Sequence, residues 1–117
     1  MTKSVLMIDD EEDFVEMMIR LLQNKGYENA QYATNGKLGI NLYKQFSHDV
    51  VFIDSQMPYL DGFQVAKELY IINPQVNIYI ISGSPTIETT AKIKNIQIKG
   101  TLLKPIKVEQ IIDILNQ

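Results

Sequence analysis

The sequence of 117 residues contains no cysteine, which excludes disulfide bonds and thiolate metal sites. Lys and Arg form no cluster, and a net charge of -3 with a pI of about 5.0 differs from the basic surface of proteins that bind a phosphate backbone. No apolar run approaches the roughly 18 residues of a membrane span, and the N-terminal residues lack the apolar stretch of a signal peptide. We therefore expect a soluble cytoplasmic protein without direct nucleic-acid binding or membrane insertion.

The composition fits one compact domain. Hydrophobic residues make up 45% of the chain and charged residues 21%, proportions that are typical of a globular protein with a single core. Because the chain has no room for a second core of this kind, we expect residues 1–117 to form one domain.

Short aliphatic or β-branched runs alternate with segments of helical periodicity, as in βαβ units that build a parallel sheet. The predicted strands cover residues 4–8, 29–33, 50–53, 76–81 and 101–103. Most of these runs are continuously apolar, which predicts strands that are covered on both faces. The sequence thus predicts an α/β protein with a doubly wound five-stranded parallel sheet. For the commonest strand order, 2-1-3-4-5, the fold is the flavodoxin-like three-layer sandwich.

Apolar residues at helical spacing predict a helix after each strand. Gly26 is expected to end the first helix in the left-handed conformation, and Asp61 with Gln64 is expected to form a capping box for the third. The fourth helix, starting at Ser84, has a thin apolar stripe and is expected to be the most mobile. The stripes of the first and last helices are Phe14, Met17, Met18, Leu21 and Leu22, and Val108, Ile111, Ile112 and Leu115.

Reactive side chains stand at the ends of four predicted strands. These residues are Asp9, Asp10, Asp54, Ser82 and Lys104. Each has an ordinary structural explanation as a turn, a cap or a solvated charge, and Glu11, Glu12 and Asp13 are best explained by a helix dipole. In an open parallel sheet, however, the carboxyl ends of strands share one edge, where ligands bind. Together these residues predict a site at that edge.

Three carboxylates in one crevice require a cation. Two carboxylates about 4 Å apart repel by about 4 kcal/mol at an effective dielectric near 20. The candidate ligands are all oxygens, which favours a hard ion, Mg²⁺ in a cell, with Mn²⁺ or Ca²⁺ as substitutes. Mg²⁺ and Lys104 together suit a phosphoryl group, and an Asp carboxylate can act as the nucleophile that forms an aspartyl-phosphate.

Four segments resemble the receiver domain of two-component response regulators, in order and over essentially the whole chain. They are VLMIDDEE, VVFIDSQMPYLDG, IYIISG and GTLLKPI. The resemblance, which is to the single-domain, chemotaxis-regulator-like type, implies a phosphorylation-operated switch and not an enzyme that turns over a separate substrate.

The resemblance also implies a role for each site residue. Asp54 accepts a phosphoryl group from a phosphohistidine on a sensor histidine kinase or phosphotransfer protein. Mg²⁺ binds Asp10, Asp54 and the backbone carbonyl of Gln56, with Asp9 acting mostly through water. Ser82 and Lys104 contact the phosphoryl group, and the bond before Pro105 is expected to be cis. A downstream protein reads the surface of the fourth helix, fifth strand and fifth helix, and a phosphorylation-dependent homodimer is possible.

Two positions depart from the usual pattern of the family. Thr101 stands where many receivers carry an aromatic residue that swings inward on activation, so this chain lacks an aromatic side chain at that position of the switch. Ser55 replaces a commoner apolar residue, and we interpret this as a small local change. Gln56 and Ser84 occupy positions where the family tunes its rate of dephosphorylation.

Three other functions share parts of this pattern. An aspartate-nucleophile phosphohydrolase usually has a second acid two residues after the nucleophile, where this chain has Gln56. A flavodoxin-like cofactor carrier needs a phosphate-binding loop after the first strand, where the acidic run Asp9 to Asp13 would repel the ligand. A phosphate-independent interaction module is possible but not favoured, since every reactive position is filled.

The remaining residues are expected to be structural. His48, the only histidine, is expected in an exposed connector before the third strand, and Met17 and Met18 are expected in the core. Gly36 and Gly39 are interpreted as a turn and a helix-packing position. The downstream output stays open, because the chain could be a stand-alone receiver or a piece of a longer regulator.

Overall fold

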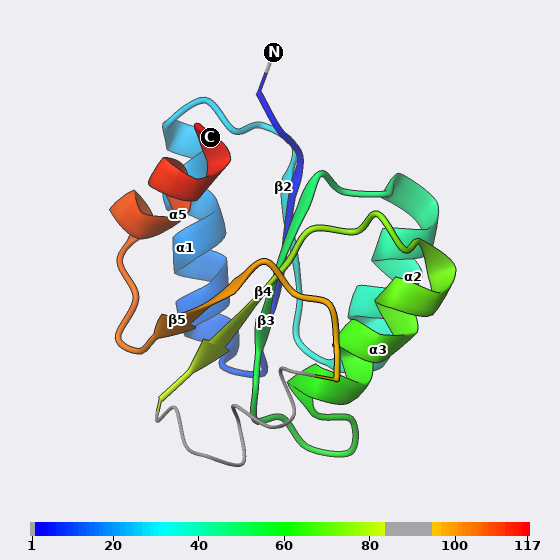
Figure 1. Cartoon of the computed structure of the whole chain (residues 1–117). Helices are drawn as coiled ribbons and strands as arrows, with labels where there is room; N and C mark the ends of the chain where they lie inside the picture. Colours follow the sequence, from blue (N-terminus) through cyan, green and yellow to red (C-terminus); the bar gives the residue numbers. More distant parts are fainter. Residues whose placement is uncertain (1, 84–94) are drawn as a thin grey trace.

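The computed structural model describes residues 2–83 and 95–117, in which five strands form one parallel sheet (Figure 1). The strand order is β2-β1-β3-β4-β5, as predicted. The strands are β1 (Val5–Ile8), β2 (Ala30–Ala33), β3 (Val50–Asp54), β4 (Ile78–Ser82) and β5 (Gly100–Leu103). The helices are α1 (Glu12–Asn24), α2 (Gly36–Phe46), α3 (Gly62–Ile72) and α5 (Val108–Leu115). The helix predicted from Ser84 lies outside the described residues.

The helices cover the sheet on both faces and complete a three-layer sandwich. Figure 1 shows α1 and α5 on one side of the sheet and α2 and α3 on the other. Two apolar clusters result, one between the sheet and α1 with α5, the other between the sheet and α2 with α3. All residues of β1 and β3 are buried, whereas the edge strands β2 and β5 are only partly so. The continuous apolar runs of β1 and β3 follow from this double coverage.

The buried face of α1 differs from the predicted stripe. Its buried residues are Val15, Met18, Ile19 and Leu22. Met17 is 49% exposed and Leu21 37% exposed, so the expectation that Met17 belongs to the core is wrong. Apolar residues recur at helical spacing both along the predicted stripe and along the stripe that is buried. Periodicity alone therefore does not select the face of α1 that packs on the sheet.

His48 is buried and not in an exposed connector. Its side chain is 3% exposed, and its ring lies against those of Tyr43 and Phe46. Nε2 of His48 lies 2.6 Å from Oε1 of Gln31 on β2, a geometry in which the ring nitrogen donates the hydrogen bond. Burial lowers the pKa of His48 below its usual value, because the charged ring would lose its hydration. The polar loop predicted from the sequence therefore contributes a neutral histidine to the packing around α2.

Two predicted helix ends are confirmed. Gly26 follows α1 with a φ of 100°, the left-handed region that favours glycine. Asp61 accepts hydrogen bonds from the backbone N–H groups of Phe63 and Gln64, and Oε1 of Gln64 accepts one from the N–H of Asp61. The N-cap residue of this capping box, Asp61, lies seven residues after Asp54, so α3 starts close to the carboxyl edge of the sheet.

Among residues 2–83 and 95–117, no helix is both long and apolar enough to cross a membrane.

Candidate functional site

Parallel pairing brings the reactive residues of separate strands to one edge of the sheet. Ile8 pairs with Ile53, Asp54 with Ile81, and Ser82 with Leu103. The residues that follow these pairs on β1 and β5 are Asp9 and Lys104. Four strands thus end at nearly the same level, and their terminal side chains share one edge, as the alternation of strands and helices predicted.

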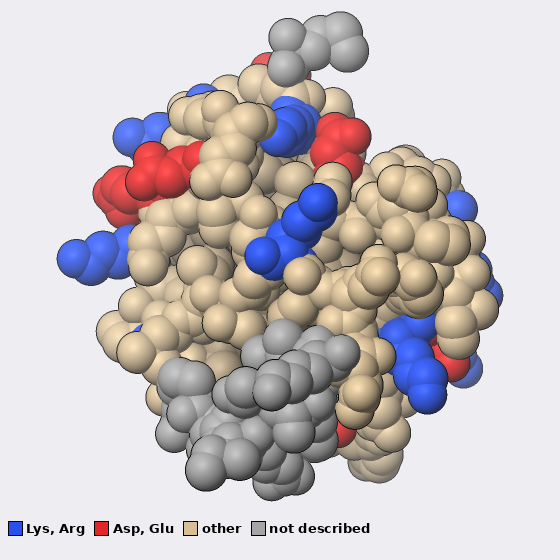
Figure 2. All heavy atoms as spheres, in the orientation of Figure 1, with Lys and Arg blue, Asp and Glu red and all other residues tan. Residues whose placement is uncertain are grey.

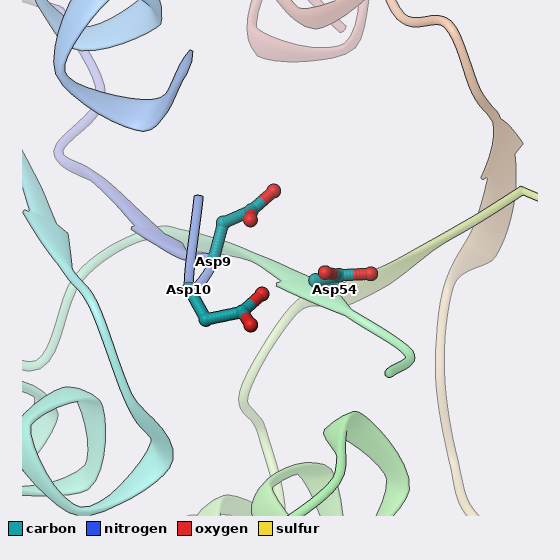
Figure 3. A group of neighbouring side chains, drawn as sticks. All are labelled: Asp9, Asp10 and Asp54. Atoms are coloured by element: carbon teal, nitrogen blue, oxygen red, sulfur yellow. The ribbon is translucent and has the colours of Figure 1, made fainter. Parts of the chain in front are cut away.

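Three carboxylates gather at this edge. One oxygen from each of Asp9, Asp10 and Asp54 lies within 4.8 Å of the others. Figure 3 shows Asp9 and Asp10 extending from the end of β1 beside Asp54 at the end of β3. Asp9 and Asp54 are buried, whereas Asp10 is exposed. The cluster therefore has two sheltered carboxylates and one that faces solvent.

Asp9 carries the clearest sign that this cluster suits a cation. Its Oδ1 accepts a hydrogen bond from the backbone N–H of Glu11 at 2.9 Å, but its Oδ2 is buried without a hydrogen-bond donor among the described residues. Burial raises the pKa of Asp9 to about 6, helped by the negative charge of Asp54. A buried, unpartnered carboxylate oxygen beside two further carboxylates fits a hard divalent ion, which prefers oxygen ligands.

Asp54 is nearly inaccessible and paired with a lysine. The residue is 3% exposed, and its Oδ1 lies 3.2 Å from Nζ of Lys104. The backbone N–H of Gln56 donates a longer hydrogen bond of 3.4 Å to the same oxygen. Burial raises the pKa of Asp54 in spite of these two favourable contacts. The proximity of Lys104 opposes this shift, and the charge of Asp10 adds to it.

Lys104 lies between two acidic side chains. Partial burial acts to lower its pKa, but the charges of Asp54, Asp9 and Glu11 outweigh this effect and raise it. Besides Asp54, its Nζ lies 3.8 Å from Oε1 of Glu11, a residue that the sequence assigned to the helix dipole alone. The Lys104–Pro105 peptide bond is cis, as the resemblance implied.

A tight backbone arrangement holds the end of β3. The N–H of Ser55 donates to the carbonyl of Ile81 at 2.8 Å, and the N–H of Gly62 donates to the carbonyl of Ser55 at 3.1 Å. A Cβ atom at Gly62 would collide with the carbonyl oxygen of Asp54 and lie 2.9 Å from the Cα of Ser55. Gly62 is therefore needed for the close approach of α3 to the end of β3. Sequence reasoning missed this role, because nothing local to residue 62 indicates what packs on it.

The other predicted site residues lie around this centre. Ser82 is buried at the end of β4, beside β3. Gln56 is exposed in the loop after Asp54. Thr101 pairs with Ile80, two residues before the end of β4, and its side chain is exposed. Thr101 is thus the predicted switch residue that the strand register places away from the carboxyl edge.

A hollow opens beside Lys104. It has a volume of about 390 Å³ and is lined by Glu11, Phe14, Gly83, Lys104, Pro105 and Ile106. Its walls are mainly apolar, and the two charged residues lie among them. The volume falls at the lower end of the range for small-molecule pockets, roughly 300 to 1,000 Å³.

Charges are dispersed on the face drawn in Figure 2. Lys and Arg side chains alternate there with Asp and Glu and are separated by uncharged surface. The described part of this face has no continuous basic surface of the kind that tracks a nucleic-acid backbone.

Comparison with known proteins agrees with this geometry. Residues 5–116 match the model of the family described as the response regulator receiver domain. The chain is 30% identical over 118 residues to the chemotaxis protein CheY of Thermotoga maritima, covering 100% of this chain and 98% of that protein.

Solved structures show the same fold. The Vibrio cholerae chemotaxis protein CheY4 superposes with a TM-score of 0.90 at 24% identity, covering 99% of this chain and 98% of the other. A chain of the CheX-CheY-BeF3-Mg²⁺ complex of Borrelia burgdorferi superposes with a TM-score of 0.84 at 19% identity, covering 95% of this chain and 84% of that chain. The family match, the strand order and the gathered aspartates lead to one conclusion, which is that the chain belongs to the response regulator receiver domain family.

Proposed function

We propose that this chain is a phosphoacceptor switch in which Asp54 receives a phosphoryl group from a phosphohistidine. The observation that carries the proposal is the position of Asp54, which is buried with Lys104 at 3.2 Å and with Asp9 and Asp10 beside it. A carboxylate oxygen of Asp54 forms the new P–O bond, while the P–N bond of the donor breaks and its electron pair leaves with the nitrogen. A sensor histidine kinase or phosphotransfer protein would supply this donor.

Each neighbour of Asp54 has a role in this reaction. Asp9, Asp10 and Asp54 would hold Mg²⁺, with the backbone carbonyl of Gln56 as a further ligand, and Mn²⁺ or Ca²⁺ as substitutes. When bound, Mg²⁺ supplies positive charge that offsets the carboxylates and the phosphoryl oxygens. Lys104 would exchange its contact with the Asp54 carboxylate for one with the phosphoryl group. The hydroxyl of Ser82 would donate a hydrogen bond to the same group.

The output would be a change of surface and not product release. Phosphorylation adds about 1.5 to 2 negative charges and three acceptor oxygens at the carboxyl edge of the sheet. Lys104 follows the end of β5 directly, so a movement of its side chain would be transmitted to β5 and α5. A downstream protein would recognise this surface together with the predicted fourth helix. Thr101 would take part without the aromatic side chain that many receivers use.

The test is covalent labelling of the purified chain with acetyl phosphate in the presence of MgCl₂. Intact-protein mass spectrometry should detect one added phosphoryl group, which hydroxylamine removes and EDTA prevents from forming. Asp54→Asn should reduce labelling at least 100-fold. Asp49→Asn is the matched control, since Asp49 precedes the same strand at its opposite end, and it should label like the parent.

Equal labelling of Asp54→Asn and the parent would overturn the proposal. Steady release of phosphate from a phosphate ester would instead indicate a phosphohydrolase. An unlabelled chain that still bound a partner would indicate a phosphate-independent interaction module.

A further inference from the structure

The hollow beside Lys104 lies next to the place where a phosphodonor must arrive. Asp54 is 3% exposed, with Asp9 and Asp10 beside it and Nζ of Lys104 at 3.2 Å. Lys104 also lines the hollow, so this space begins one side chain away from the reactive carboxylate. A donor that approached Asp54 along this side would place its leaving group in or at the mouth of the hollow.

The walls of the hollow combine apolar surface with one exposed acid. Phe14, Pro105 and Ile106 provide the apolar part, which suits a flat uncharged ring or a small group. The side chain of Glu11 is 68% exposed, and its Oε1 lies 3.8 Å from Nζ of Lys104. Because Lys104 is closer to Asp54 than to Glu11, its charge is mainly offset by Asp54. Glu11 therefore leaves a net negative charge at the edge of the hollow.

This charge distinguishes between classes of phosphodonor. When phosphorus is bound to a nitrogen of a protonated leaving group, as in phosphoramidate and phosphoimidazole, that group is positive before transfer and neutral afterwards. When phosphorus is bound to a carboxyl oxygen, as in acetyl phosphate, the leaving group departs as an anion. A carboxylate within a few ångströms attracts the first kind and repels the second.

We propose that Glu11 and the hollow beside it are a leaving-group subsite, which favours donors with a protonated nitrogenous leaving group over acyl phosphates. This inference rests on the proposed function of Asp54. In the favoured reaction an Asp54 oxygen forms the P–O bond as the P–N bond breaks. The nitrogen keeps the bonding electron pair, and the leaving group keeps the proton that it already carries, so no further reactant is needed. Glu11 is thus a specificity residue of the phosphotransfer site.

The experiment compares two small donors on the same protein. Apparent second-order rate constants for labelling of Asp54 are measured with phosphoramidate and with acetyl phosphate, at fixed MgCl₂ and pH 7. The readout is the rate constant with phosphoramidate divided by the rate constant with acetyl phosphate. A general change in folding or metal affinity alters both rate constants alike and leaves this ratio unchanged. Glu11→Gln should lower the ratio by about two- to fivefold, as expected for one exposed charge. Glu11→Lys should lower it further, and Glu11→Asp should retain most of it.

Glu12→Gln is the matched control. It removes the same charge from the adjacent residue in the first turn of α1, and Glu12 does not line the hollow. Its ratio should equal that of the parent. The difference between Glu11→Gln and the parent should also shrink as salt is raised from about 0.01 to 1 M, because salt screens the exposed charge.

The possible outcomes distinguish a failure of the leaving-group subsite from a failure of Asp54 as phosphoacceptor. An unchanged ratio in Glu11→Gln and Glu11→Lys overturns the leaving-group subsite while leaving Asp54 as phosphoacceptor. An equal change in Glu12→Gln overturns it as well, since the effect would then belong to the overall charge. If neither donor labels the parent at Asp54, the proposed function fails and this inference fails with it.

Discussion

The amino and carboxyl edges of the sheet each carry an aspartate, and the two aspartates differ in burial and in hydrogen bonding. At the amino edge, Oδ2 of Asp49 accepts hydrogen bonds from the backbone N–H of Ser4 at 2.7 Å and from its hydroxyl at 3.2 Å. At the carboxyl edge, Asp9 is fully buried, and one of its oxygens has no hydrogen-bond donor among the described residues. The exposed Asp49 joins β1 to β3, whereas the buried Asp9 lies beside further negative charge.

This difference distinguishes an aspartate that stabilises the fold, Asp49, from one that belongs to a binding site, Asp9. Asp49 has the partners that a stabilising carboxylate needs, and its own carbonyl accepts a further hydrogen bond from the side chain of Asn77. Asp9 has a donor for Oδ1 only, so its buried Oδ2 is held without a partner at a cost in stability. A carboxylate kept under these conditions is typical of a binding site.

The largest expected effect concerns the backbone that carries the carboxyl edge. Gly62→Ala should lower the free energy of unfolding by about 2 to 4 kcal/mol, because the new methyl group meets the backbone of Asp54 and Ser55. Gly83→Ala is the control, since a Cβ there meets nothing within 4 Å. Urea denaturation of both variants measures the difference. Equal stability of the two would show that α3 can move away from β3 at little cost.

Removing the charge of Asp9 should stabilise the protein in the absence of metal. Asp9→Asn is expected to raise the free energy of unfolding at pH 7.5 by about 1 to 3 kcal/mol, since it removes a buried charge whose pKa is raised to about 6. An ionised group with a raised pKa costs stability above that pKa and costs none below its unfolded value of 3.8. The gain should therefore diminish as the pH falls from about 6 to about 4.

Denaturation in EDTA at several pH values checks this prediction. Added MgCl₂ should then stabilise the parent more than Asp9→Asn. A destabilised Asp9→Asn in EDTA would contradict the contrast between the two edges.

The corresponding change at the amino edge should have the opposite sign. Asp49→Ala is expected to lower the free energy of unfolding by about 1 to 2 kcal/mol, because the backbone N–H of Ser4 loses its acceptor. Thermal denaturation with and without MgCl₂ should give the same difference from the parent in both conditions. A magnesium-dependent difference would indicate that Asp49 also belongs to a metal site, which would contradict the contrast between Asp49 and Asp9.

The smallest effect concerns His48, near the amino edge. Its pKa is lowered by burial, so the neutral ring contributes stability that is present above the unfolded pKa of 6.5 and is lost as the pH falls through the lower folded value. We expect the parent to lose up to about 1 kcal/mol more than His48→Gln between pH 7 and pH 5. Parallel urea titrations measure this loss. A parent that gained stability relative to His48→Gln would contradict the neutral buried ring.

The sequence, combined with the strand order that is commonest in this fold class, was sufficient to predict the sheet and the chemistry of the strand ends. Continuous apolar runs such as Val50 to Ile53 indicate strands covered on both faces, and the topology of parallel sheets then brings Asp9, Asp54 and Lys104 together. The capping box at Asp61 was equally predictable, because its partners lie within four residues. These features depend on local pattern or on a topological rule that holds for the whole fold class.

Only the tertiary structure decided which side chains those elements bring into contact. The burial of Val15 in place of Met17, the packing of His48 against Gln31, and the approach of Glu11 to Lys104 all join segments that are distant along the chain or choose between two similar faces. Helical spacing is the same for either stripe of α1, and a polar loop is the same whether or not another element covers it. The physical reason is that a side chain becomes buried only when a second surface packs on it, and one stretch of sequence describes only the first of the two surfaces.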